Sequence, residues 1–400
     1  MKYLISGGGT GGHIFPAVSI ANALRELDPQ ADILFVGALG RMEMERVPQA
    51  GYKIIGLPVR GFNRKQPWKN ISVVWDLLRS MVQARRIVRE FRPDVGIGVG
   101  GYASGAAMKV AAKMGVPILL QEQNGFAGVT NKLLKDDARK ICVAYEGMER
   151  FFPAEKILLT GNPVRQDLVH GSKEQAIAYL QKEYGVAFSL KRPTLLIIGG
   201  SLGARTINQA LLAGVQQLLD QGIQVIWQTG KTYYEQIRSQ LSNCPGAQAS
   251  SPAELSNCPG AQASPPAELS NSKLSNSQIV VTPFLTNMPD LYALADLVIS
   301  RAGASSISEL CLLGKPAILV PSPNVAEDHQ THNAMALVKK DAAVLVKDAD
   351  AQQQLIPTAL ALLQDPARLS ALSAHILTLA QPDSAHRIAE EVIQLAKRTE

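Results

Sequence analysis

The chain opens with "MKYLISGGGTGGHIFPA", residues 1–17, where a short apolar run leads into glycines and then into an apolar helical pattern. This order is typical of a strand, a tight turn and a helix. Glycines at such a junction let an anion approach the unpaired N–H groups of the helix start. The stretch therefore predicts a parallel α/β sheet with an anion site at its first turn.

The spacing of the glycines does not identify the ligand. Gly7, Gly9 and Gly12 match a dinucleotide-binding fingerprint, but the expected second strand ends without the acidic residue that would bind a ribose. A P-loop would need Lys and then Ser or Thr after Gly12, where this chain continues with His13. A packing turn without a ligand is the third alternative. His13 argues against it, because an imidazole on the first helical turn can act as a base or bind a ligand.

Length and composition narrow the class of protein. A chain of 400 residues exceeds what one hydrophobic core usually serves, so we expect two domains. The net charge of +6 is too small to imply nucleic acid, and no nucleic-acid partner is expected. There is no apolar run long enough to span a membrane and no room for a signal peptide before the first strand, which favours a cytoplasmic protein.

Metal-binding patterns are weak. The cysteines form no C-x-x-C pair, and His329 and His332 have no further ligand near them in the sequence. We therefore expect neither a metal nor a cofactor.

Strand-like apolar runs alternate with helix-like stretches, which predicts parallel sheets with helices on both faces. The runs form two similar sets that open with "LISGGGTGGH" and "LIIGGSLGAR". The expected fold class is α/β, with two Rossmann-like, doubly wound domains at 1–163 and 164–382, and with a helix at about 383–400 packing back on the first. The low-complexity stretch 241–277, in which one unit is repeated nearly verbatim, is interpreted as a duplicated surface insertion.

Five segments at the ends of expected strands are rich in glycine or in Asn, Gln and Glu: 7–13, 98–105, 121–128, 199–204 and 300–309. Glycine loops and helix starts suit a diphosphate, while carboxylates and amides suit a sugar or ribose. Ligands bind beyond the carboxyl ends of the strands in such sheets, so the segments together predict a phosphate-and-hydroxyl site. Each is weak alone, since Glu309 could also be a first-turn acid that complements a helix dipole.

Seven motifs, in this order and spacing, resemble the MurG family of bacterial cell-wall glycosyltransferases: "GGTGGHIFPA", "GVGGYASG", "QEQNGFAGVTNK", "GNPVR", "GGSLGAR", "SRAGASSISE" and "EDHQTHNA". The resemblance implies the GT-B fold, in which two Rossmann-like domains face each other across a cleft. It implies an inverting transfer of N-acetylglucosamine from UDP-N-acetylglucosamine to the 4-hydroxyl of undecaprenyl-diphosphate-linked N-acetylmuramyl pentapeptide. That step converts lipid I to lipid II in peptidoglycan synthesis, which supports cell shape and cell division.

The resemblance also implies roles for residues at matching positions. Catalytic or acceptor-side positions are His13, Glu122, Tyr102 and Asn131, with His13 as the first candidate for the base and Glu122 as the second. The other substrate-binding positions are Thr10, Gly11, Gly12, Asn124, Arg165, Ser201, Leu285, Ala304, Ser305, Ser306, Ile307, Ser308, Glu309 and Gln330. Among these, Leu285 is expected to meet the uracil through its backbone, and the segment ending at Glu309 to close over the ribose and phosphate.

One predicted helix pairs apolar and basic residues. Ile71, Val74, Trp75, Leu78 and Val82 recur at helical spacing, with Arg79, Arg85, Arg86 and Arg89 close by. Periodicity alone does not distinguish a core-facing helix from one that contacts a membrane. Because the implied acceptor carries a polyprenyl chain, we expect Trp75, Leu78 and Val82 to contact an anionic membrane surface together with Arg79, Arg85 and Arg86. The protein would then be peripheral, at the cytoplasmic face of the cell membrane.

Two other functions stay open. A UDP-N-acetylglucosamine 2-epimerase resembles this fold and donor but needs no lipid acceptor. A non-catalytic nucleotide-sugar-binding protein would bind the donor without turning it over.

Overall fold

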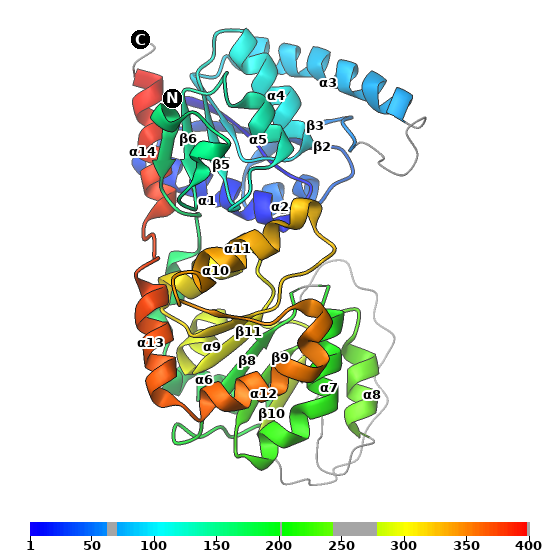
Figure 1. Cartoon of the computed structure of the whole chain (residues 1–400). Helices are drawn as coiled ribbons and strands as arrows, with labels where there is room; N and C mark the ends of the chain where they lie inside the picture. The colour runs from blue at the N-terminus through cyan, green and yellow to red at the C-terminus, as the bar shows by residue number, and fades with distance from the viewer. Residues whose placement is uncertain (62–69, 201, 243–277, 398–400) are drawn as a thin grey trace. The chain divides into compact units, whose positions relative to one another are not determined.

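The structure is a computed structural model that describes residues 1–61, 70–200, 202–242 and 278–397 (Figure 1). Ser201 and nearly all of the predicted insertion at 241–277 lie outside the described residues. Contacts divide the chain into two compact units. The first comprises Met1–Gln166, Gly303–Glu309 and Ala380–Glu400, and the second comprises Asp167–Ala302 and Leu310–Leu379.

The first unit is built on a parallel sheet that has seven strands among the described residues, in the order β3-β2-β1-β4-β5-β6-β7. The strands are β1 (Lys2–Ser6), β2 (Asp32–Ala38), β3 (Lys53–Leu57), β4 (Val95–Gly98), β5 (Ile118–Glu122), β6 (Lys140–Val143) and β7 (Ile157–Leu159). The helices are α1 (Gly11–Leu27), α2 (Glu43–Gln49), α3 (Asn70–Phe91), α4 (Tyr102–Lys113), α5 (Val129–Leu134) and α14 (Ser384–Lys397).

Both faces of this sheet are covered, so its central strands are apolar on both sides. Tyr3 and Ile5 of β1 pack in one cluster with residues of α1 and α14, while Leu4 packs in another with residues of α3 and α4. The alternation follows from the two-residue period of a strand. The opening run of the sequence forms a strand, as predicted, and the structure places it in the middle of the sheet, buried from Tyr3 to Ser6.

The last helix, α14, red in Figure 1, packs against α1. Ile388 and Val392 are fully buried in the same cluster as Ile14. At the helix start, His386 Nε2 lies 2.7 Å from Glu26 Oε2, and Arg387 Nη2 donates to Leu159 O at 2.8 Å. The C-terminal segment thus belongs to the core of the first unit.

The second unit repeats the plan with a parallel sheet that has six strands in the described part of the chain, in the order β10-β9-β8-β11-β12-β13. They are β8 (Thr194–Ile198), β9 (Gln224–Gln228), β10 (Ile279–Thr282), β11 (Leu297–Ser300), β12 (Ala317–Leu319) and β13 (Val344–Leu345). The accompanying helices are α6 (Lys173–Tyr184), α7 (Arg205–Asp220), α8 (Tyr234–Ser242), α9 (Met288–Leu294), α10 (Ala304–Leu312), α11 (His329–Val338), α12 (Ala351–Leu363) and α13 (Pro366–Leu377). The part of α10 up to Glu309 groups with the first unit by its contacts. Among the short 3₁₀ turns, η2 (Met148–Arg150) and η3 (Ala154–Lys156) belong to the first unit, and η4 (Gln166–His170) begins at the last residue of that unit's main segment. The turns η5 (Ala326–Asp328) and η6 (Asp348–Asp350) belong to the second unit.

A hydrogen-bonded pair of side chains, Trp227 and Asn208, connects α7 to this sheet. Trp227 of β9 is fully buried, and its Nε1 donates to Asn208 Oδ1 at 2.9 Å. Asn208 Nδ2 in turn donates to Thr229 O at 2.9 Å. A buried indole needs a partner for its single donor, and this pair supplies one.

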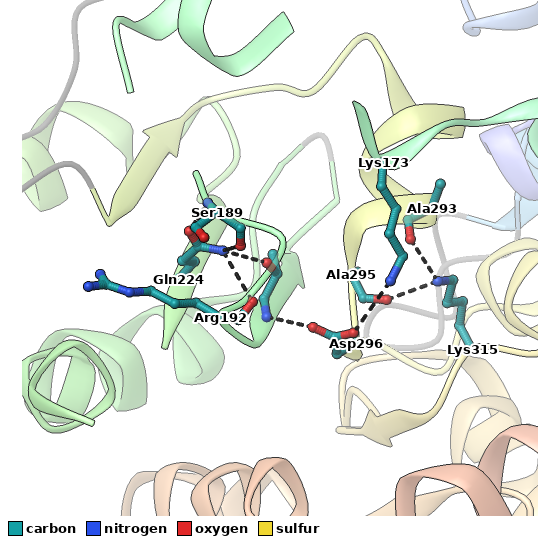
Figure 2. A network of polar contacts seen from close by, with 9 residues as sticks. Lys173, Ser189, Arg192, Gln224, Ala293, Ala295, Asp296 and Lys315 are labelled. Carbon is teal, nitrogen blue, oxygen red and sulfur yellow. Dashed lines mark hydrogen bonds and ion pairs between the residues drawn. The ribbon is translucent and has the colours of Figure 1, made fainter. Parts of the chain in front are cut away.

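The amino ends of the strands in the second unit are tied together by polar contacts (Figure 2). Gln224 Nε2 donates to Ser189 O and to Thr194 Oγ1, each at 3.0 Å, and Thr194 N donates to Asp296 Oδ2 at 2.8 Å. Beside them, Lys315 Nζ donates to Ala295 O at 2.9 Å. These contacts use side chains for structure at the end of the sheet that lies away from the strands' carboxyl ends.

Two parallel sheets with Rossmann-like strand orders confirm the predicted fold class, α/β with two doubly wound domains. Within the described ranges, no helix is both long enough and apolar enough to cross a bilayer.

Candidate functional site

In the first unit, the strand order reverses direction between β1 and β4, which lie next to each other. Ligands of doubly wound sheets bind beyond the carboxyl ends of the strands at such a point. The loops that follow these two strands contain Gly9, Gly100 and Gly101, with φ of +88°, +93° and +89°. A Cβ on Gly101 would lie 2.5 Å from Gly8 O, so the two loops approach each other at backbone distance.

His13 stands on the first turn of α1 at this position. The residue is partly buried, and its Nδ1 lies 3.0 Å from Gly8 O and 3.2 Å from Thr10 Oγ1. A carbonyl oxygen only accepts, so the bond to Gly8 O assigns the proton of the neutral imidazole to Nδ1. Nε2 then carries the lone pair, as a proton acceptor requires. The ring lies over the second loop, since a Cβ on Gly100 would be 3.0 Å from Nε2.

The first loop also binds a carboxylate of the protein itself. Glu43, at the start of α2, is fully buried and accepts hydrogen bonds from Gly9 N at 2.9 Å and Ala38 N at 3.0 Å. The acid that a dinucleotide-binding fingerprint requires at the end of the second strand is absent there, and Glu43 stands five residues after that strand. The signal that could have found it is the early acid of "RMEMERVP" directly after a glycine-containing strand end.

Glu122 ends β5 and is only 2% exposed. Its Oε2 accepts from Gly128 N and from Asn131 Nδ2, both at 2.9 Å, and its Oε1 accepts from Asn124 N at 3.2 Å. Burial raises the pKa of Glu122, although these hydrogen bonds oppose that rise. The structure thus brings three predicted site residues, Glu122, Asn124 and Asn131, into one buried cluster that closes the loop after β5.

Tyr102 begins α4 and is 56% exposed. Its ring lies against Gly61, where an added Cβ would come within 2.7 Å of it. Next to it, Thr130 Oγ1 of α5 donates to Gly101 O at 3.3 Å. Tyr102 therefore directly follows the loop after β4, in which Gly100 contacts the His13 ring. Thr10 and Gly12 are exposed at the start of α1, and Arg165 is exposed near the end of this unit's main segment.

The apolar stripe predicted on α3 does not face the core at the four positions whose side chains are described, a set that leaves out Ile71. Val74, Trp75, Leu78 and Val82 are 48%, 64%, 51% and 73% exposed. A different set, which includes Val73, Ala84, Ile87 and Val88, is buried. Arg79, Arg85, Arg86 and Arg89 are exposed on the same helix, and Arg86 Nε pairs with Glu90 at 2.7 Å. The reading of this stripe as an ordinary core-facing face is wrong for these residues.

In the second unit, the loop after β8 contains Gly200 and Gly203, with φ of +76° and +88°. A Cβ on Gly203 would overlap Thr229 O, so this loop touches the one that follows β9. Leu285, just after β10, is 2% exposed, so its side chain is buried. Gln330 Oε1 accepts from Ser322 N at 2.9 Å and is thereby held at the start of α11.

The predicted segment from Ala304 to Glu309 forms the first part of α10, which begins four residues after β11 ends. Its members Ser305, Ser306 and Ser308 are partly buried. Glu309 is partly buried in the second helical turn, and the first turn of α10 holds no acid. The alternative in which Glu309 is a first-turn acid complementing the helix dipole is therefore wrong.

An ion pair that was not predicted from the sequence lies directly after the carboxyl end of β11. Arg301, after β11, pairs with Asp348 and donates to Val320 O at 3.1 Å. Thr206 Oγ1 of α7 donates to the other oxygen of Asp348 at 3.0 Å. An Asp-x-Asp spacing, which was not expected in this sequence, is present at Asp348 and Asp350. Within the described residues, no group of three His, Cys, Asp or Glu side chains could hold a metal ion.

Family models match both halves of the chain. Residues 3–143 match the glycosyltransferase family 28 N-terminal domain, and residues 194–388 match the glycosyltransferase family 28 C-terminal domain. A relative from Bacteroides fragilis is 56% identical over 402 residues, which cover 100% of this chain and 97% of the relative. A relative from Bacteroides thetaiotaomicron is 54% identical over 400 residues, with 99% and 98% covered. Both are named UDP-N-acetylglucosamine–N-acetylmuramyl-(pentapeptide) pyrophosphoryl-undecaprenol N-acetylglucosamine transferase.

Solved structures share the fold. MurG from Acinetobacter baumannii superposes with a TM-score of 0.74 at 24% identity, covering 98% of this chain and 99% of that one. UDP-GlcNAc 2-epimerase from Neisseria meningitidis gives a TM-score of 0.63 at 14% identity, covering 98% and 100%. At these identities the likeness speaks to the fold alone.

Proposed function

The chain belongs to glycosyltransferase family 28, and on that basis we propose that it transfers N-acetylglucosamine from UDP-N-acetylglucosamine to undecaprenyl-diphosphate-linked N-acetylmuramyl pentapeptide. The relatives that carry the name of this reaction are more than half identical over nearly their whole length. The UDP-GlcNAc 2-epimerase structure shares the fold at only 14% identity, so epimerase activity is the less favoured alternative. The acceptor's 4-hydroxyl is the proposed nucleophile.

The observation that carries the mechanism is the hydrogen bond between His13 Nδ1 and Gly8 O. It leaves Nε2 as the proton acceptor at the end of β1, where a doubly wound sheet binds its ligands. As the 4-hydroxyl oxygen bonds to C1 of the donor sugar, Nε2 takes the hydroxyl proton. The bond from C1 to the diphosphate oxygen breaks at the same time, and UDP leaves with its electron pair. A single displacement of this kind inverts the configuration at C1.

Glu122 is the second candidate for the base. Its burial and its backbone and amide donors favour a different role, which is to shape the loop that carries Asn124. Exposed Tyr102, at the start of α4, would face the acceptor, whereas Asn131 is buried and would act by holding Glu122. Thr10, Gly11 and Gly12 would contribute N–H groups of the first helical turn to a diphosphate.

The second unit carries much of the proposed donor site, whereas Arg165 and the segment from Ala304 to Glu309 group with the first unit by their contacts. In the second unit, the glycine loop after β8 would hold the UDP diphosphate, and the backbone at Leu285 would meet the uracil. The positions from Ala304 to Glu309 would contact the ribose and phosphate, Gln330 a sugar hydroxyl, and Arg165 the diphosphate. Support comes from the positive-φ glycines and from the buried side chain of Leu285.

The proposed location is the cytoplasmic face of the bacterial cell membrane, with the protein bound peripherally. The exposed side chains of Val74, Trp75, Leu78 and Val82 support this, because burying them in a lipid interface removes apolar surface from water. The arginines of α3 would meet anionic headgroups.

The deciding experiment incubates the protein with radiolabelled UDP-N-acetylglucosamine, with and without the lipid-linked acceptor. We expect label in the lipid phase only when the acceptor is present. Conversion of the nucleotide sugar without acceptor would indicate an epimerase instead. Binding of the donor with no turnover under either condition would indicate a binding protein.

A further inference from the structure

Glu43 is a buried carboxylate to which the proposed mechanism gives no role. Both its oxygens accept backbone hydrogen bonds, from Gly9 N at 2.9 Å and from Ala38 N at 3.0 Å. The loop is shaped around it, because a Cβ on Gly8 would overlap the carboxylate. Burying a carboxylate is costly, so a residue held this way needs a reason beyond filling space.

The Gly8 to Gly9 peptide group connects Glu43 to His13. Its N–H, on Gly9, donates to Glu43 Oε2 at 2.9 Å. Its C=O, on Gly8, lies 3.0 Å from His13 Nδ1. One planar amide therefore bonds to the carboxylate on one side and to the imidazole on the other.

We propose that Glu43 is a positioning residue, which holds His13 in its reactive tautomer through the Gly8 to Gly9 peptide group. This inference rests on the proposed role of His13 as the base. A peptide whose N–H is bonded to a carboxylate is polarised, which makes its C=O a stronger acceptor. That C=O then retains the proton on Nδ1 and keeps Nε2 unprotonated, as an outer carboxylate orients a metal-binding histidine in other sites.

The first test replaces Glu43 with Gln, which has nearly the same shape. An amide presents NH₂ where a carboxylate oxygen stood, so one of the two backbone N–H groups loses its acceptor. We expect kcat for transfer to fall by about tenfold to a hundredfold, with the KM for UDP-N-acetylglucosamine changed by less than about twofold. Glu45→Gln is the matched control, since Glu45 is exposed on the same helix, and it should leave both constants unchanged.

A double-mutant cycle separates positioning from general support of the fold. In the His13→Ala background, Glu43→Gln should have no further effect on kcat, because the carboxylate acts through the imidazole. An equal loss in both backgrounds would overturn the inference and assign Glu43 to stability alone.

A measurement on the unaltered protein covers the case in which Glu43→Gln does not fold. Nitrogen-15 NMR of the histidines, with His13 assigned by comparison with His13→Ala, should show neutral His13 protonated at Nδ1. Protonation at Nε2 would overturn the inference. If His13→Ala instead keeps near-normal turnover, the proposed base is wrong, and the NMR result still decides whether His13 has the tautomer that the inference requires.

Discussion

Glu122 Oε2 accepts a 2.9 Å hydrogen bond from Asn131 Nδ2, nine residues further along the chain. The same oxygen accepts from Gly128 N, the residue before α5, so one carboxylate oxygen bonds to both the start and the first turn of this helix. This arrangement makes the carboxylate a structural centre of the loop that carries Asn124.

Glu122→Ala should therefore destabilise the protein. It removes the acceptor of the Gly128 N–H and of one of the two Nδ2 hydrogens of buried Asn131, whose other hydrogen bond, to Gln121 O, remains. An unsatisfied buried donor costs roughly 1–3 kcal/mol, so we expect the free energy of unfolding to fall by about 2 kcal/mol or more, measured by urea denaturation. Glu149→Ala, at an exposed site of the same unit, should change it by less than about 0.5 kcal/mol. Wild-type stability in Glu122→Ala would contradict the structural role.

His13→Ala should reduce turnover by roughly a hundredfold or more while leaving the affinity for UDP near that of the wild type. The reason is that the imidazole takes a proton in the transition state and is not placed among the donor contacts. Steady-state kinetics with the lipid-linked acceptor and calorimetry with UDP make the comparison. Near-normal turnover would remove His13 from the mechanism.

Glu309→Ala should weaken UDP binding by at least about tenfold, because charge-assisted hydrogen bonds to ribose hydroxyls contribute roughly 1.5–3 kcal/mol each. For this variant, 2'-deoxy and 3'-deoxy UDP should lose little further affinity. Calorimetry measures both effects. Glu235→Ala, an exposed acid in the second unit, is the control. Wild-type affinity in Glu309→Ala would rule out the ribose contact.

Trp75→Ala combined with Arg85→Glu should reduce co-sedimentation with vesicles that contain anionic lipid. The first change removes exposed apolar surface, and the second replaces attraction to headgroups with repulsion. Leu377→Ala, at a 52% exposed leucine of α13, controls for the loss of any exposed apolar side chain. Unchanged co-sedimentation of the double variant would count against membrane contact through α3.

Lys315 gives a prediction about pH. Burial, with a smaller effect of nearby Lys173, lowers the pKa of Lys315 to about 8. A depressed pKa contributes stability that is present above the unfolded-state value of 10.5 and is lost as the pH falls through about 8. The stability advantage of the wild type over Lys315→Met should therefore shrink between pH 10 and pH 7. Denaturation series at several pH values test this, with Lys339→Met, an exposed lysine, as the control. A difference that stays constant would contradict the shift.

The sequence by itself determined the features that depend on near neighbours in the chain. Apolar runs that end in glycines define the strands and turns, because backbone conformation and the two-residue side-chain period are local properties. The class of fold and the place of His13 on a first helical turn follow from that pattern. The family also follows, since its motifs are short and contiguous.

Tertiary structure alone decided which side chains meet and which are covered. Glu43 reaches Gly9 across 34 residues, and Arg301 reaches Asp348 across 47, so no local pattern contains either pair. The apolar residues of α3 recur with the same helical period whether they face the core or the solvent. In the folded protein another face of α3, which includes Val73 and Ala84, packs against the core, so Trp75 stays exposed. Burial and pairing depend on the whole fold because they are set by distant segments that displace water together.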